Sequence, residues 1–233
     1  MLQVNQLSVS YAAPILHEVS LKIVPGEFVC MIGKSGCGKS TLLGKICDEV
    51  SGIVRTKSLA FVTQEDLLLD WRTALQNVLL PIELKGRVTK DAVIQAKKLL
   101  ELVELQDSLH KLPSELSGGM RQRVTLARGL LQDSDLYLFD EPFSALDFDL
   151  RIQLGKVLRE FIVSNRKAAL FVTHNIEEAI ALSDRVLVIG GRPGRIVHEE
   201  KITFTETKRN PVAIRAEPDF AESFATLWNS LSL

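Results

Sequence analysis

The chain has 233 residues, of which 46% are apolar and 24% are charged, as in an ordinary folded protein built around one main core. Its formal net charge of -1 gives no support to a nucleic-acid-binding or anionic-membrane-binding role, and its apolar runs are too short for a membrane-spanning helix. No secretory signal is visible, and Cys30, Cys37 and Cys47 form neither an even set nor a metal-binding spacing, so we expect a reducing, cytosolic setting.

Short apolar segments alternate with helical patterns along the chain. Residues 2–11 alternate between apolar and polar side chains, as a half-buried strand does. We expect further strands at 28–32, 58–63, 136–139, 168–172 and 185–189, and helices at 40–47, 89–105, 119–130, 146–163 and 176–182. Buried strands that alternate with helices predict an α/β fold with a mostly parallel sheet.

Two parts of the chain depart from this alternation. Residues 66–134 are helical in pattern, rich in leucine and without a convincing strand, which predicts a helical subdomain inserted into the core. The tail at 203–233 ends in an amphipathic aromatic pattern, which is compatible with a short docking helix or with a mobile extension. We therefore expect a main domain at 1–205 and a C-terminal extension at 206–233.

A glycine-rich segment follows the strand expected at 28–32 and precedes a helix, which is the context of a phosphate-binding loop. Its glycines let backbone N–H groups face phosphate oxygens, and the next helix adds its positive dipole end. A glycine turn with a chance lysine is the alternative, which the flanking strand and helix disfavour. Lys39 is expected to reach the β- and γ-phosphates of ATP, and the Ser40 hydroxyl to ligate Mg²⁺. We assign ATP binding to Gly33, Lys34, Ser35, Gly36, Cys37, Gly38, Lys39, Ser40 and Thr41.

The cysteines need separate treatment because one of them lies inside this loop. Cys37 is expected to be a small residue tolerated where side chains point outward, and a reactive thiol protected by ATP is the alternative. Cys30 and Cys47 are expected to be buried apolar residues.

Two acids close the apolar strand expected at 136–139. Open α/β sheets bind ligands at the carboxyl ends of their strands, so Asp140 is expected beside the phosphate loop as a Mg²⁺ ligand. Glu141 would then orient or deprotonate the attacking water. An apolar run followed by two acids is often only a strand that ends at the surface, but the upstream phosphate loop favours the catalytic interpretation.

Two more polar residues follow core strands. His174 comes after the strand at 168–172, where a lone histidine is more often structural; the third core strand favours a contact with the γ-phosphate. Gln64 ends the strand at 58–63 and could bind Mg²⁺ or water through its amide oxygen.

Residues 116–123 read Leu-Ser-Gly-Gly-Met-Arg-Gln-Arg and closely resemble the signature motif of ATP-binding cassette (ABC) ATPases. At a helix N-terminus, Ser117 and the N–H groups of Gly118 and Gly119 would bind phosphate. The phosphates of the ATP bound by this chain are already assigned to its phosphate loop. The resemblance therefore implies that the signature completes the site of a second ATPase subunit, in a head-to-tail dimer that holds two ATP molecules.

Further marks of this family follow in order, and the resemblance covers nearly the whole chain up to about residue 200. It implies a Q-loop at Gln64, a Walker B end at Asp140 and Glu141, a D-loop at 144–147 that brings Asp147 to the dimer interface, a switch histidine at His174 and an adenine-stacking aromatic at Tyr11. A strand-end tyrosine without such a role is the alternative for Tyr11.

Residues 141–147 resemble a stretch common to many importer ATPases. Residues 70–78, and especially 191–196, resemble more narrowly the ATPases of nitrate, sulfonate and taurine importers, although 191–196 also fits a plain Gly/Pro turn between two strands. This resemblance implies an ATPase subunit that works on the cytoplasmic face of the inner membrane, bound to permease subunits and served indirectly by a solute-binding protein. We expect the segment 67–80 to face the permease, with Trp71 in the docking surface and most of its leucines in the core.

One departure from the family is that only 24 residues, 40 to 63, separate Lys39 from Gln64. This predicts a reduced antiparallel sheet and weakens the assignment of Tyr11. A soluble, non-transport ABC ATPase acting on nucleic acid or the ribosome is the alternative function. It fits less well, because the chain has neither a long coiled-coil insertion nor a second cassette and its charge is near neutral. A phosphoryl-transfer kinase would leave the signature and 144–147 unexplained.

Overall fold

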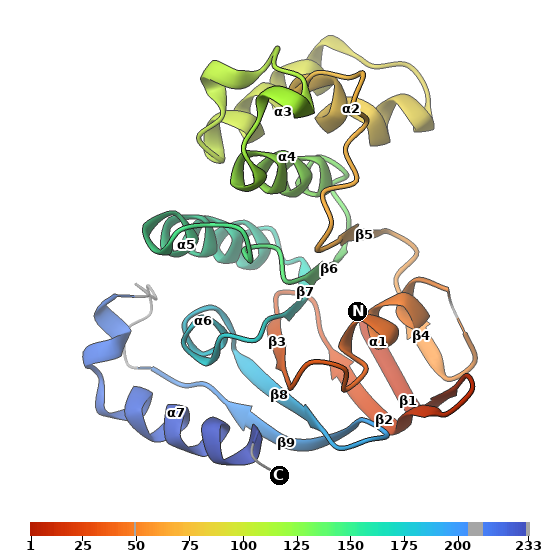
Figure 1. Cartoon of the computed structure of the whole chain (residues 1–233), viewed down its shortest axis with the longest axis vertical. Helices are drawn as coiled ribbons and strands as arrows, with labels where there is room; N and C mark the ends of the chain where they lie inside the picture. The colour runs from red at the N-terminus through yellow and green to blue at the C-terminus, as the bar shows by residue number, and fades with distance from the viewer. Residues whose placement is uncertain (49, 205–211, 232–233) are drawn as a thin grey trace.

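The computed structural model describes residues 1–48, 50–204 and 212–231, so the domain boundary expected at 205 and 206 lies outside the described residues. The described chain forms two β-sheets, with a group of helices at one end of the molecule (Figure 1).

The larger sheet has six strands in the order β5-β6-β7-β3-β8-β9. They are β5 (Leu59–Val62), β6 (Leu136–Asp140), β7 (Ala168–Val172), β3 (Phe28–Ile32), β8 (Arg185–Gly190) and β9 (Arg195–Lys201). The first five run parallel, and β9 is antiparallel to β8. All residues of β3, β6 and β7 are buried, as expected for parallel strands covered on both faces. The predicted α/β fold with a mostly parallel sheet is confirmed.

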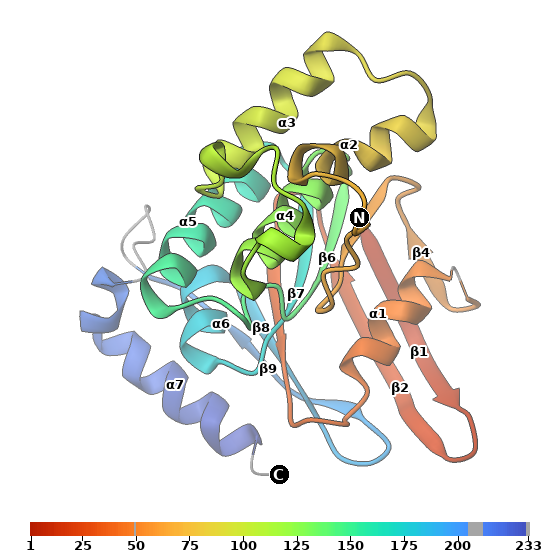
Figure 2. The same cartoon turned by 45° about the horizontal axis from the view of Figure 1, so that its top comes forward.

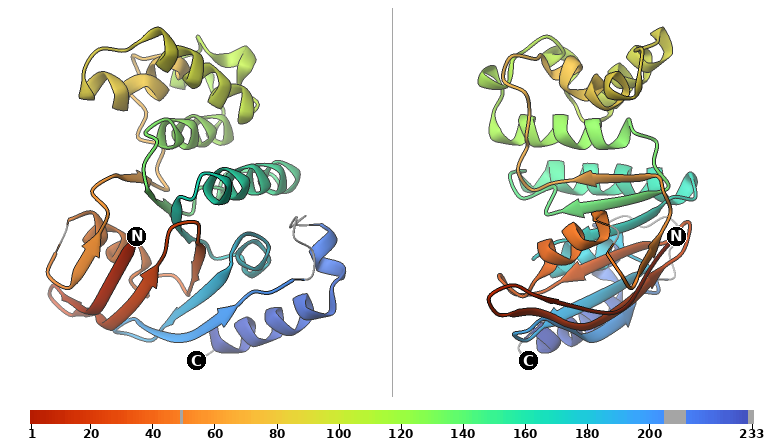
Figure 3. Two further views of the ribbon diagram at one scale, coloured as in Figure 1. Left: turned by 180° about the vertical axis from the view of Figure 1, so that it is seen from behind. Right: turned by 90° about the vertical axis from the view of Figure 1, so that its right-hand side faces the viewer.

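Neighbouring residues along the central strands point into two separate cores. Phe28 and Phe139 pack against α4 (Gly118–Leu130), α5 (Phe148–Ser164), α6 (Ile176–Leu182) and α7 (Pro218–Leu231). Val29 and Leu138 pack instead against α1 (Lys39–Cys47) and the smaller sheet. In Figure 3 (right), α5 lies on one side of β5 and β6, and α1 and the β1–β2 hairpin lie on the other. The central sheet is therefore held rigidly from both faces.

The smaller sheet is antiparallel, with the order β2-β1-β4. It consists of β1 (Leu2–Ser10), β2 (Pro14–Ile23) and the three-residue β4 (Ile53–Arg55). The reduced antiparallel sheet was predicted, but β2 and β4 were not. The register between β1 and β2 shifts where Gln6 and Glu18 take positive φ angles, and such bulges interrupt the two-residue alternation that identifies a strand.

Helices α2 (Ala74–Lys85), α3 (Lys90–Leu102) and α4 make up most of the stretch from 66 to 134, all of which the structure describes and in which no residue lies in a strand. Side chains at the N-caps fix where these helices begin: Thr73 and Gln76 form a capping box on α2, and Thr89 caps α3. The three helices pack against one another (Figure 2), and Figure 1 shows them beyond α5. The helical pattern predicted for this stretch is confirmed, while its limits as a subdomain stay a prediction.

The described part of the tail contains the 3₁₀ helix η3 (Ala213–Ala216) and α7. Phe220 and Leu227 of α7 are buried in the same core as α6. Helix α7 also contacts β8 and β9 (Figure 1). Of the two alternatives for the tail, the docking helix is therefore the one seen in residues 218–231.

Candidate functional site

Four neighbouring strands of the large sheet deliver the candidate residues to one edge. In the order β5-β6-β7-β3, these strands lead to Gln64, to Asp140 and Glu141, to His174, and to the phosphate loop. Because the four strands are parallel, their carboxyl ends lie at the same edge of the sheet. Residues far apart in the sequence are thus brought together by topology alone.

A cavity of about 500 Å³ opens at this edge. Its volume is that of a typical small-molecule site. Most of the predicted phosphate-loop residues line it, together with Gln64, Glu141 and His174, whereas Asp140 is not among the lining residues. The lining residues are Ile15, Gly33, Ser35, Gly36, Gly38, Lys39, Ser40, Thr41, Gln64, Glu141 and His174.

Two glycines are required by the geometry of the phosphate loop. Gly38 has a φ of 99°, and a Cβ on it would lie 2.5 Å from a side-chain carbon of Leu16. A Cβ on Gly33 would lie 2.5 Å from the Ile189 carbonyl oxygen. A side chain at either position would therefore push the loop away from the sheet edge. This close packing leaves the loop backbone as the wall of the cavity.

Lys39 is the first residue of α1 and lines the cavity, so the free N–H groups at the start of that helix also lie beside the cavity. The side chain is 8% exposed, and its Nζ donates to the carbonyl oxygens of Gly33 at 2.8 Å and Lys34 at 3.1 Å. The loop thus holds a buried positive charge where a phosphate group can meet it.

Asp140 ends β6 beside Ser40. Burial raises the pKa of the Asp140 carboxyl, while a hydrogen bond with the Ser40 side chain and the positive charge of Lys39 act in the opposite direction. The hydroxyl of Ser40, the carboxylate of Asp140 and the amide of Gln64 supply the oxygen ligands that Mg²⁺ prefers. Among the described residues, no group of three or more His, Cys, Asp or Glu side chains is arranged to hold a metal ion.

Glu141 and His174 form a hydrogen-bonded pair, with 3.0 Å between Glu141 Oε2 and His174 Nδ1. The Glu141 side chain is 20% exposed and the His174 side chain 67%. Glu141 has a φ of 46°, an uncommon conformation for this residue type, and its N–H is anchored on the Val172 carbonyl at 3.0 Å. The turn after β6 thereby directs the carboxylate toward the cavity and the histidine.

The expectation for Cys37 was wrong. Its side chain does not point outward: it is 4% exposed and belongs to the core beneath the phosphate loop, beside Leu16. A Cβ on Gly33 would lie 2.8 Å from its Sγ, which shows how closely the thiol fills the space under the loop. Cys30 is fully buried as expected, whereas Cys47 is only half-buried. Burial raises the pKa of the thiols of Cys30 and Cys47.

Tyr11 and Lys34 were also predicted to bind ATP, but neither lines the cavity. Tyr11 is 67% exposed at the end of β1, and the Lys45 ammonium lies 5.6 Å from the centre of its ring. A role for Tyr11 in stacking on adenine stays a prediction.

The signature residues lie at the N-terminus of α4. The Ser117 hydroxyl caps this helix by accepting from the Met120 N–H at 3.3 Å. Ser117 and Gly118 are exposed, and neither they nor Gly119 line the cavity around the phosphate loop. The start of α4 is therefore exposed and lies outside the cavity around this chain's own phosphate loop.

Gln122 links the signature helix to the turn after β6, a contact that sequence analysis did not predict. Its Nε2 donates to the Glu141 carbonyl at 3.2 Å and to Ser144 Oγ at 3.0 Å, and its Oε1 accepts from the Ala145 N–H at 2.9 Å. Gly119, three residues earlier, packs so closely that a Cβ on it would lie 3.0 Å from the Ala145 carbonyl oxygen. The spacing of three residues between Gly119 and Gln122 places both on one face of the helix and could have indicated this contact.

Asp147 ends the turn that Gln122 holds. Its carboxylate caps α5 by accepting from the Leu150 N–H at 3.0 Å, and the residue is exposed. Like Ser117, it is therefore a helix cap within this chain as well as a residue predicted to reach a partner.

Comparison with known proteins identifies the family. The family described as "ABC transporter" matches residues 16–144. An aliphatic sulfonates import ATP-binding protein, SsuB of Bacillus cereus, is 38% identical over 84% of this chain and 82% of its own length. The chain belongs to the ABC transporter family. It is an ATP-binding cassette ATPase.

Other similar proteins agree with this assignment. The taurine import ATP-binding protein TauB of Rhizobium johnstonii is 38% identical over 95% of this chain and 93% of its own length. The dimeric structure of MJ0796, a bacterial ABC transporter cassette, matches with a TM-score of 0.79 and 28% identity over 88% of this chain and all of that one. A dimeric structure of the same cassette in a post-hydrolysis state, bound to ADP and Pi, matches equally well.

Proposed function

We propose that this ABC ATPase is the energy-coupling subunit of an importer for a small anion such as a sulfonate, taurine or nitrate, or for a related small organic solute. The observation that carries the ATPase part is the edge of the sheet where the phosphate loop, Asp140 and the Glu141–His174 pair meet. The importer part is supported by the SsuB and TauB relatives, which are named for sulfonate and taurine import and align with most of this chain.

Within the site, the backbone of residues 33–41 and the Lys39 ammonium bind the phosphates of ATP. Glu141 orients and deprotonates the attacking water. His174 contacts the γ-phosphate and holds the Glu141 carboxylate through the 3.0 Å hydrogen bond. Ser40, Asp140 and Gln64 would hold Mg²⁺, which when bound neutralises negative charge on the phosphate oxygens.

The second half of each site comes from another copy of the chain. Ser117, Gly118 and Gly119 provide N–H groups at a helix N-terminus that does not serve this chain's own cavity. Placed against the phosphate loop of a partner, they would bind the γ-phosphate there, with Asp147 at the same interface. A head-to-tail homodimer would thus contain two complete sites. The dimeric MJ0796 cassette, 28% identical to this chain, supports this arrangement.

The surface around Trp71 is the proposed contact with the permease. Trp71 is 74% exposed, although exposed tryptophan is uncommon on a protein surface. It borders a cleft of about 350 Å³ whose other lining residues are Arg72, Gln76, Leu79, Glu83 and Val88. Three apolar lining residues, Trp71, Leu79 and Val88, beside the Arg72–Glu83 ion pair suit an amphipathic helix of a membrane partner.

The permease would hold the ATPase at the cytoplasmic face of the inner membrane as a peripheral subunit, and a solute-binding protein would deliver the solute to the permease. In the described ranges, no helix is both long and apolar enough to cross a bilayer.

A photocrosslinker placed at position 71 tests this contact. In membranes that contain the assembled transporter, we expect it to capture a hydrophobic, multi-span protein. The matched control is a crosslinker at Leu84, which is 79% exposed on the same helical region but does not line the cleft. Capture only within the chain, or capture of ribosomal protein or nucleic acid from position 71, would contradict the importer assignment.

A further inference from the structure

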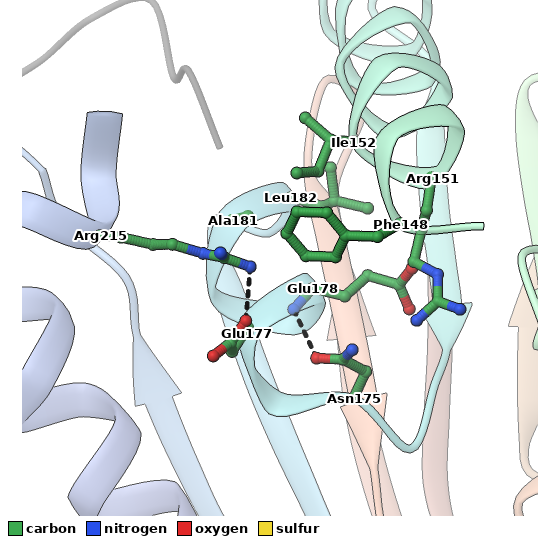
Figure 4. A pocket seen from close by; sticks show the side chains of 9 residues that line it. All are labelled: Phe148, Arg151, Ile152, Asn175, Glu177, Glu178, Ala181, Leu182 and Arg215. Atoms are coloured by element: carbon green, nitrogen blue, oxygen red, sulfur yellow. Dashed lines mark hydrogen bonds and ion pairs between the residues drawn. The ribbon is translucent and has the colours of Figure 1, made fainter. Parts of the chain in front are cut away.

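A small pocket separates the C-terminal extension from the two helices that begin next to the site. It has a volume of about 40 Å³ and lies between the N-termini of α5 and α6 and the 3₁₀ helix η3 (Figure 4). Its lining residues are Phe148, Arg151, Ile152, Asn175, Glu177, Glu178, Ala181, Leu182 and Arg215. Across this pocket, Arg215 contacts Glu177 and Phe148.

Arg215 belongs to η3 and contacts both helices. Its Nη2 donates to Glu177 Oε2 at 2.5 Å, in the first turn of α6. Its guanidinium also lies over the ring of Phe148, the first residue of α5, with 5.0 Å between the guanidinium carbon and the ring centre. The side chains of Arg215 and Glu177 are 35% and 43% exposed, so solvent screens the ion pair and its contribution to folding stability is small. Arg215 thus bridges the first turn of α6 and the first residue of α5.

The N-terminus of α6 is bonded directly to the loop that carries His174. The Asn175 side chain caps α6 by accepting from the Glu178 N–H at 3.1 Å (Figure 4). The Thr173 hydroxyl donates to the Glu178 carboxylate and accepts from the Asn175 N–H. Both neighbours of His174 are therefore bonded to the first turn of α6, so a shift of that turn moves the histidine.

The N-terminus of α5 is equally close to the site. Phe148 follows Asp147 directly, and Arg151 donates to the Leu146 carbonyl at 3.0 Å, which fixes the turn after Glu141. The Arg151 guanidinium also lies beside the Glu178 carboxylate (Figure 4), whose pKa is raised by burial. Glu178 Oε1 and Arg151 Nε are buried and have no hydrogen-bond partner, and the positive charge of Arg151 acts against burial by lowering the pKa of the Glu178 carboxyl.

We propose that Arg215 is a positioning residue for hydrolysis. By joining Glu177 to Phe148, it keeps His174 at hydrogen-bonding distance from Glu141. The extension thus acts on the catalytic site without touching ATP. This inference rests on the roles proposed above for Glu141 and His174. Small displacements of a positioned group reduce the rate of the chemical step more than the binding of the substrate.

The test is steady-state ATPase kinetics of the full-length chain. For Arg215→Ala we expect kcat to fall about threefold to tenfold, with KM for ATP and the unfolding temperature unchanged. Arg215→Lys, which keeps the charge near Glu177 and Phe148, should recover most of the rate. Combining Arg215→Ala with Glu177→Ala should be no slower than the slower single variant, because both remove the same contact. If Arg215→Ala does not fold, Arg215→Gln takes its place.

The matched control is Glu222→Gln, a charge change at an exposed position of α7 outside the pocket, which should leave kcat unchanged. A wild-type kcat in Arg215→Ala, no recovery with lysine, or additive losses in the double variant would each overturn the proposal. His174→Ala is measured alongside. If it is inactive while Arg215→Ala is fully active, only the role of the extension is wrong; if His174→Ala itself is fully active, the proposed site roles fail.

Discussion

The Glu141→Gln variant is expected to bind ATP, to lose turnover and to accumulate as an ATP-stabilised dimer. The amide keeps the size of the side chain and can still bond to His174, but it cannot take a proton from water. Loss of a general base lowers a rate by about 10²- to 10⁴-fold. ATP hydrolysis, ATP affinity and mass in solution with ATP and Mg²⁺ would be measured on the same preparation.

A suitable control is Glu101→Gln, the same substitution on an exposed face of α3, which should hydrolyse ATP at the wild-type rate and not accumulate as a dimer. Turnover at the wild-type rate in Glu141→Gln would remove this residue from the mechanism. Loss of ATP binding would show that Glu141 supports the cavity and not the chemistry.

The Ser117→Arg variant is expected to bind ATP as a monomer with normal affinity, but to lose dimer closure and nearly all hydrolysis. Ser117 is exposed at the N-terminus of α4 and does not line this chain's own cavity, so an arginine there leaves the first half of the site intact. On closure, the larger side chain would occupy the space needed by the partner's γ-phosphate. ATP affinity, dimer formation and hydrolysis separate these effects.

The substitution also removes a helix cap, which by itself costs about 1 kcal/mol of stability. Thr89→Arg is the matched control, because Thr89 caps α3 in the same way and is not part of the signature. This control should lose a similar amount of stability and keep its activity. Dimerisation with ATP by Ser117→Arg would contradict a role of the signature in the partner's site.

The helices and strands predicted correctly are those whose local sequence pattern matches the way they are buried in the fold. Strands β3 and β7 and helix α6 have the predicted limits, because continuously apolar strands or a capped amphipathic turn specify them locally. The phosphate loop was predicted for a similar reason, since its glycines are required by backbone geometry. The meeting of Gln64, Asp140 and His174 with this loop followed from the parallel topology.

The strands and side-chain contacts that were not predicted depend on interactions between distant residues, which no local sequence pattern indicates. Strand β2 is interrupted at Glu18, and β9 is a largely polar strand at the edge of the sheet, so neither shows a clear alternation. Cys37 is buried because the loop folds over it. The contacts of Gln122 and Arg215 each join segments that are far apart in the sequence.

If each ATP site is built from two chains, as proposed, the specific ATPase activity must depend on protein concentration. ATP affinity and sedimentation would be measured over the same range. We expect ATP to bind, but not to be hydrolysed efficiently, at protein concentrations where sedimentation shows only monomer; activity per chain should then rise with concentration and level off where the dimer is fully formed. A constant activity per chain at concentrations where sedimentation shows only monomer would contradict the proposal that each site is built from two chains.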